Sequence, residues 1–115
     1  LSNISTANRN NYYKIKPVIR LVKYWNVTKN RKSFSSYQIE QKIVDHYLSC
    51  RYQEYDTKKY LLTSLELLYT LVEFLYQKEN LARAIENVEA AIKSAEYSYY
   101  EIEAESIIKS VIGEF

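Results

Sequence analysis

Glycine, proline, cysteine and methionine are all scarce in this 115-residue chain. It has one Gly, one Pro, one Cys and no Met, whereas average usage would give about 8 glycines. So few glycines exclude a Gly-rich phosphate loop, a dinucleotide fingerprint and the tight hairpin turns of a β-sandwich. The length suits one domain, and 47% of the residues are hydrophobic, which is enough for a core. The composition therefore predicts an all-α fold.

The single cysteine and single histidine limit the chemistry of the chain. Cys50 has no second cysteine with which to form an intramolecular disulfide, which fits a reducing cytosol. Cys50 and His46 together are too few ligands for a metal cluster, and no Ser-His-Asp or Cys-His pair is suggested by spacing. We therefore expect a cytoplasmic location, no catalytic residue and no metal ligand within this chain.

No segment is apolar for long enough to cross a membrane. The longest apolar stretch, residues 61–76, is broken by Glu66 and Glu73, whereas a span needs about 18 residues. The chain also starts at Leu1 and has no signal peptide. We therefore expect no membrane partner. We also expect the chain to be a piece of a longer parent protein, to which its function belongs.

Charge is divided unevenly along the chain. Residues 1–60 carry 12 Lys or Arg and four Asp or Glu, whereas residues 61–115 carry four and 10. The span from Lys14 to Lys32 holds seven basic residues and no acidic one. Such a block is a candidate site for phosphate or nucleic acid. The alternative, which composition alone favours, is a solvated helix face that pairs with the acidic half.

Apolar periodicity predicts four helical stretches. Residues 1–9 are polar and lack periodicity, so they are expected to be a linker or an extended lead-in. A first helix over residues 11–28 carries an apolar stripe, with Pro17 near its start. A second helix begins at the capping box of Ser35 and Gln38.

The second half of the chain continues the helical pattern. Asp56 or Thr57 is expected to cap a third helix, the most buried one, which ends at a break over residues 77–80. Asn80 is expected to cap a last stretch that shifts its pattern near residues 97–102 and stops at Gly113. The last helices are expected to pack lengthwise on the third. Together the patterns predict an all-α bundle of four to five helices.

The basic first helix and the start of the second could form an anion site. Arg20 and Lys23 are three residues apart, so they share a helix face. Ser36 opens the next helix, where free N–H groups and the helix dipole favour an anion. A lysine beside a helix N-terminus would hold a phosphate group from two sides.

Two segments in this region resemble a known pair. Residues 16–26 read KPVIRLVKYWN, and residues 35–40 read SSYQIE. They resemble the start of the helical C-terminal domain in nucleotidyltransferases of the oligoadenylate synthase and cyclic GMP-AMP synthase group. Bacterial members of that group make cyclic nucleotide second messengers for antiviral defence. Residues 104–115 are similar to the final helix of the family, which closes with a Gly and a Phe.

The resemblance implies roles for particular residues. In the family, the lysine of the Lys-x-Trp segment binds the triphosphate of the donor nucleotide, and here that lysine is Lys23. A polar residue just before the Tyr of the next helix also contacts the phosphates, and here it is Ser36. Arg20 is a weaker candidate as a neighbour on the same face. Trp25 and Glu40 are expected to be structural.

The resemblance also implies what this chain lacks. The catalytic parts of the family are a Gly-Ser turn and three metal-binding acids on a β-sheet domain N-terminal to this one. Those acids hold the Mg²⁺ ions that activate the attacking hydroxyl, so we expect this chain alone to be inactive. We therefore expect residues 1–10 to be a lead-in and residues 11–115 a nucleotide-binding lobe. Its expected partners are an NTP substrate and the catalytic N-terminal domain of the same parent chain.

Two functions of other classes stay open. A helical interaction module that uses the acidic last helix against a partner predicts an oligomer and no response to phosphate. A basic nucleic-acid-binding domain is possible but less favoured. It predicts an affinity that falls steeply with salt and is competed by any polyanion.

Overall fold

A computed structural model describes residues 3–50 and 56–95, and every regular element within these ranges is helical. The elements are α1 (Ile4–Arg9), α2 (Ile15–Lys29), α3 (Ser36–Ser49), α4 (Thr57–Leu67), the 3-10 turn η1 (Leu68–Leu71) and α5 (Leu75–Ala95). The predicted all-α bundle of four to five helices is confirmed for this part of the chain. The predicted pattern shift near residues 97–102 and the expected final helix lie outside the described residues.

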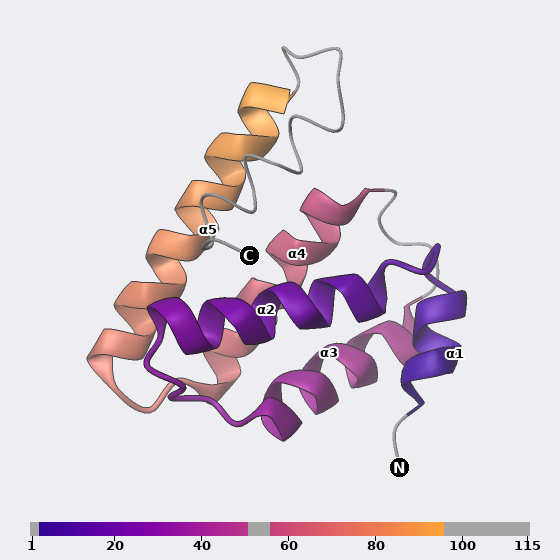
Figure 1. The fold of residues 1–115 in the computed structure, drawn as a ribbon, viewed down its shortest axis with the longest axis horizontal. Coiled ribbons are helices and arrows are strands. Elements are labelled where there is room, and N and C mark those ends of the chain that lie inside the picture. Colours follow the sequence, from indigo (N-terminus) through magenta and orange to yellow (C-terminus); the bar gives the residue numbers. More distant parts are fainter. Residues whose placement is uncertain (1–2, 51–55, 96–115) are drawn as a thin grey trace.

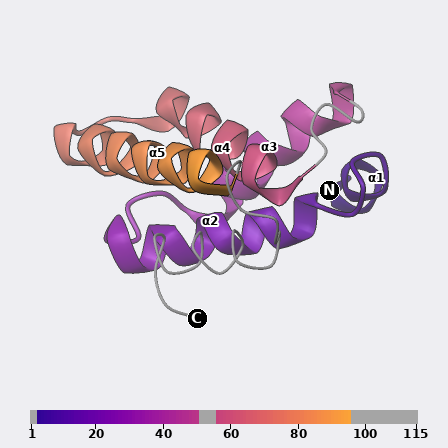
Figure 2. The same cartoon turned by 90° about the horizontal axis from the view of Figure 1, so that it is seen from above.

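The helices pack so that α2 contacts α1, α3 and α4. Figure 1 shows α2 across the middle of the molecule, α3 beside it and α1 across one end. The second view shows α2 along one side of α4 and α5 (Figure 2). The most extensive contact between helices is that of α4 with α5. This confirms the expected packing of the last helical stretch on the third for the described part of α5.

One apolar core fills the space between the helices. The stripe predicted on the first long helix is the buried face of α2, and its residues are at most 3% exposed: Ile15, Val18, Ile19, Val22 and Trp25. The other helices add Ala7, Ile39, Ile43, Tyr47, Leu61, Leu65, Leu81 and Val88. Burial of these faces against one another is the main source of stability for helices of this length.

Two predicted helix starts are confirmed. The N–H of Gln38 donates to Ser35 Oγ at 3.0 Å, and the N–H of Ser35 donates to Gln38 Oε1 at 3.1 Å. Asp56 Oδ1 accepts the N–H of Lys59 at 3.2 Å and caps α4. Both caps join groups three residues apart, so the local sequence is sufficient to specify them.

The first helix differs from the sequence prediction. Residues 4–9 form α1 instead of an extended lead-in, and Ala7 is fully buried there. Asn8 Oδ1 accepts the N–H of Lys16 at 3.0 Å, so α1 supplies a cap for the first turn of α2. The helix is only six residues long. Its contacts with α2 and α3 support it, and a periodicity search cannot detect them.

The start of the last helix also differs. α5 begins at Leu75, so Asn80 lies inside α5 and is not its cap. Gln77 Oε1 instead accepts the N–H groups of Glu73 at 2.8 Å and Phe74 at 3.0 Å. Here the capping side chain lies inside the helix that it caps. A search for Ser, Thr, Asp or Asn before the apolar run does not find such a cap.

Candidate functional site

The basic block between Lys14 and Lys32 divides between two sides of α2 and the connection that follows it. Arg20 is exposed and Lys23 is half-buried on one side, whereas Lys29 lies in the last turn near Trp25. Neither of the two ion pairs within residues 3–50 and 56–95 joins this block to the acidic half of the chain. Pairing between the two halves therefore does not account for the basic block in the part that is described.

Lys23 lies beside the beginning of α3. Its Nζ is 3.5 Å from Glu40 Oε2, and the two side chains are 34% and 30% exposed. Glu40 is one helical turn after Ser36, so Ser36 and Glu40 share a face of α3. The structure thus brings the predicted lysine to the α3 face on which the predicted serine lies.

The capping box leaves donors available at the start of α3. It uses the N–H groups of Ser35 and Gln38, and the N–H of Ile39 donates to Ser35 O at 3.1 Å. The N–H groups of Ser36 and Tyr37 remain, as is usual in the first turn of a helix. The exposed Ser36 hydroxyl and these N–H groups could bind an anion together with Lys23.

The remaining predicted residues take positions that fit their expected roles only in part. Arg20 is exposed one turn before Lys23 on α2, and no hydrogen bond or ion pair fixes its side chain within the described part. Trp25 is 2% exposed in the core, as expected for a structural residue. Glu40 contacts the lysine directly and would compete with phosphate for it.

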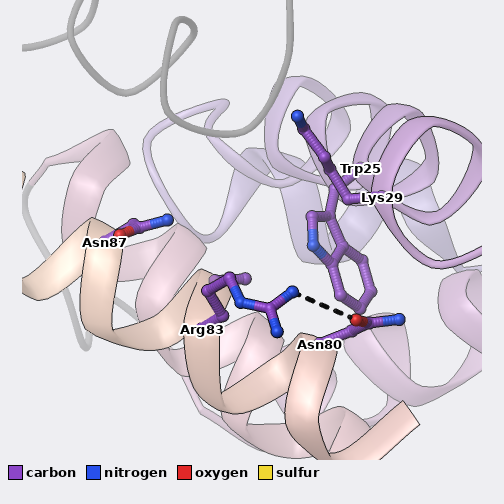
Figure 3. Close-up of a pocket in the computed structure, with 6 residues that line it drawn as sticks. Trp25, Lys29, Asn80, Arg83 and Asn87 are labelled. Carbon is purple, nitrogen blue, oxygen red and sulfur yellow. Dashed lines mark hydrogen bonds between the residues drawn. The ribbon is translucent and has the colours of Figure 1, made fainter. Parts of the chain in front are cut away.

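A pocket that the sequence interpretation missed lies on the other side of α2. Its volume is about 180 Å³, and its walls are α2 and residues 80–87 of α5 (Figure 3). The lining residues are Trp25, Lys29, Asn80, Arg83, Ala84 and Asn87. The sequence did contain a signal for this pocket wall. Polar residues spaced by three and four positions share one side of a helix, as Asn80, Arg83 and Asn87 do.

The part of the chain that the structure describes shows neither a metal-binding group nor a membrane-spanning helix. Among the residues that the structure describes, no three His, Cys, Asp or Glu side chains form a group that could hold a metal ion. None of the described helices combines the length and the apolar composition that a bilayer crossing requires.

Comparison of the chain with protein-family models, with curated proteins and with solved structures finds no match. The resemblance to nucleotidyltransferases therefore stays a prediction that rests on the sequence segments 16–26, 35–40 and 104–115.

Proposed function

We propose that this chain is the helical lobe of a nucleotidyltransferase that joins NTPs into oligonucleotide second messengers, and that it binds the NTP phosphates. The supporting observation is the position of the Lys23 ammonium, 3.5 Å from Glu40 and on the α3 face that carries Ser36. A cation beside a helix N-terminus is a favourable environment for phosphate. This argument uses only charge and geometry, and it selects the same two residues as the sequence resemblance.

In this proposal each residue has a distinct role. The Lys23 ammonium and the first N–H groups of α3 bind phosphate oxygens, the Ser36 hydroxyl donates to another, and Arg20 adds positive charge. Glu40 holds the ammonium when no nucleotide is bound. Because the ion pair is partly exposed, it contributes at most about 1 kcal/mol, so a triphosphate with several negative charges can displace the carboxylate. Mg²⁺ would belong to the catalytic domain of the parent chain, and this lobe would bind and orient the substrate.

Replacing Lys23 by alanine in the parent enzyme tests the site. We expect Lys23→Ala to raise the Kd for NTP about 5- to 150-fold, because a hydrogen bond to a charged group contributes about 1–3 kcal/mol. Equilibrium binding of a labelled NTP measures the change. Lys59→Ala is the matched control, since Lys59 is an exposed lysine on α4, and its Kd should equal that of the unmodified enzyme.

Two further results bear on the proposal. Glu40→Gln removes the competing charge, so it should leave NTP binding equal or tighter. Equal Kd values for Lys23→Ala and Lys59→Ala would exclude Lys23 from the site. The coding sequence upstream of Leu1 tests the enzyme class: a Gly-Ser turn followed by an Asp-x-Asp pair supports it. A start codon a few residues before Leu1 would contradict it and favour a stand-alone helical module.

A further inference from the structure

The pocket between α2 and α5 contains two cations and no carboxylate among its lining residues. Lys29 and Arg83 form no ion pair within residues 3–50 and 56–95. Glu79 and Glu86 lie about one turn on either side of Arg83 along α5, yet neither comes within ion-pair distance of its guanidinium. Both cations therefore keep N–H donors that a ligand can use.

The indole of Trp25 supplies a third donor. Trp25 is 2% exposed and lines the pocket, and no hydrogen bond in the described part of the chain uses its Nε1. Figure 3 shows the indole nitrogen on the side of the ring that faces Arg83. The nitrogen is not among the buried polar atoms of the described part that lack a partner, so it reaches the open pocket. A ligand oxygen that enters the pocket can therefore accept this N–H.

A chain of asparagine hydrogen bonds positions Arg83. Asn30 Nδ2 donates to Asn26 Oδ1 at 3.1 Å, and Asn80 Nδ2 donates to Asn30 Oδ1 at 3.0 Å. Arg83 Nη1 then donates to Asn80 Oδ1 at 3.4 Å, the bond drawn in Figure 3. Because Asn26 and Asn30 are buried, the guanidinium is linked to the core of the bundle. A group positioned in this way loses less conformational entropy when a ligand binds.

We infer that this pocket binds one phosphate group of a phosphate-bearing ligand through Lys29, Arg83 and the indole N–H of Trp25. The guanidinium and the indole N–H can donate to different oxygens of one phosphate group. Figure 3 shows the Lys29 ammonium turned away from Arg83, so its flexible side chain would turn inward when the anion binds. The pocket measures about 180 Å³, below the roughly 300 Å³ at which pockets for drug-sized ligands begin. It therefore suits a compact group, and the rest of the ligand would lie outside.

This site is separate from the one proposed at Lys23. Lys23 and Trp25 are two residues apart on α2, so their side chains point about 200° apart around the helix axis. The two sites therefore have different donors, and variants can test them independently. The phosphate group could belong to a nucleotide or to a nucleic-acid backbone. Tyr76 lies one turn before Asn80, and its ring stacks on the exposed ring of Phe74 with the centroids 5.8 Å apart. Because nucleic-acid bases stack on aromatic rings, the nucleic-acid backbone is tested as a source of the phosphate.

The only tryptophan of the chain is a direct probe of this site. Its indole N–H gives one cross-peak in a ¹H–¹⁵N correlation spectrum of the full 115-residue chain. We expect inorganic phosphate, added at constant ionic strength, to shift this cross-peak along a saturable curve that chloride does not reproduce. Lys29→Gln and Arg83→Gln should each raise the apparent Kd about tenfold or more.

Controls make the experiment specific to the pocket. Lys93 is an exposed lysine on α5, the helix that carries Arg83. Lys93→Gln should therefore leave the phosphate curve unchanged. Lys23→Ala should also leave it unchanged. Circular dichroism confirms that each variant is folded. A nucleoside triphosphate and oligothymidylate are titrated in parallel, and whichever binds more tightly than inorganic phosphate identifies the source of the group.

Several results would overturn the inference. One is an indole cross-peak that stays in place with phosphate, or that moves as far with chloride. Another is an Arg83→Gln variant whose phosphate curve equals that of Lys93→Gln. Loss of the shift in Lys23→Ala would show that phosphate acts from the Lys23 side and not in this pocket.

Discussion

Buried asparagines connect the helices of this bundle at the level of single residues. Asn11 Nδ2 lies 2.9 Å from Ala7 O, 3.3 Å from Tyr47 O and 3.2 Å from Cys50 O. The hydroxyl of Tyr60 donates to Asn11 Oδ1 at 3.2 Å. One fully buried side chain therefore contacts the ends of α1 and α3 and the first turn of α4. Its removal would leave buried polar groups without these partners.

Asn11→Ala should destabilise the fold by about 2–3 kcal/mol, because each buried polar group left unsatisfied costs about 1–3 kcal/mol. Urea unfolding of the full chain measures the loss. Asn10→Ala is the control, since no hydrogen bond to the Asn10 side chain is found in the described part, and it should change stability by less than about 0.5 kcal/mol. An equal loss in both variants would contradict this role for Asn11.

Of the two candidate phosphate sites, the sequence could suggest the one at Lys23 but not the pocket at Arg83. Lys23 and Ser36 belong to consecutive helices joined by a short connection, so helical spacing is enough to suggest that they meet. Trp25 and Arg83 are far apart in the sequence and belong to helices that are not consecutive. No spacing rule relates them, because their approach depends on how α4, which packs against both helices, places α5 relative to α2.

Helix connections are the notable feature at the level of elements. Within residues 3–50 and 56–95, four residues other than glycine adopt positive φ: Tyr12 and Tyr13 before α2, and Arg31 and Lys32 after it. The left-handed conformation costs a non-glycine residue roughly 1–2 kcal/mol. Hydrogen bonds offset part of this cost after α2, where the N–H of Lys32 donates to Asn26 O at 2.8 Å. The scarcity of glycine thus did not prevent tight turns between helices.

Substitutions at Lys32 should reveal the cost of the left-handed backbone. Lys32→Gly should leave stability equal or raise it by up to about 1 kcal/mol, because relief of the strain is partly cancelled by the greater freedom of unfolded glycine. Lys32→Val should lower stability by at least about 1 kcal/mol, because a β-branched residue is disfavoured at positive φ. Thermal unfolding measures both changes.

A second position serves as the reference for this comparison. Lys59→Val replaces an exposed lysine inside α4, where the expected loss is only a helix-propensity difference of about 0.5 kcal/mol. If Lys32→Val costs no more than Lys59→Val, the left-handed turn carries no measurable strain.

At the level of the whole molecule, residues 4–9 belong to the bundle. α1 buries Ala7 against the core, and Asn8 caps the start of α2. α1 crosses the end of the α2–α3 pair, as the two ribbon views show (Figures 1 and 2). An N-terminal boundary at residue 11, drawn from sequence, would therefore remove a packed helix.

Deletion of residues 1–10 tests this boundary. The shortened chain should lose at least about 2 kcal/mol of unfolding free energy, because it loses both a helix cap and buried apolar surface. Urea unfolding of both chains measures the difference in unfolding free energy, provided that each chain unfolds in one cooperative transition. Equal stability of the two chains would mean that these residues are only a lead-in.

The sequence by itself determined the helical class, the apolar face of α2 and the starts of α3 and α4. These features depend on the 3.6-residue period and on caps that span three residues, so neighbouring residues contain the necessary information. The Gln77 cap of α5 is also local, because it joins residues three and four apart, although a search for a cap before the apolar run does not find it. Only the tertiary structure decided that α1 is a packed helix and that Arg83 lies beside Trp25. Each of these depends on contacts between separate elements, whose geometry is set when the apolar faces of the helices pack into one core.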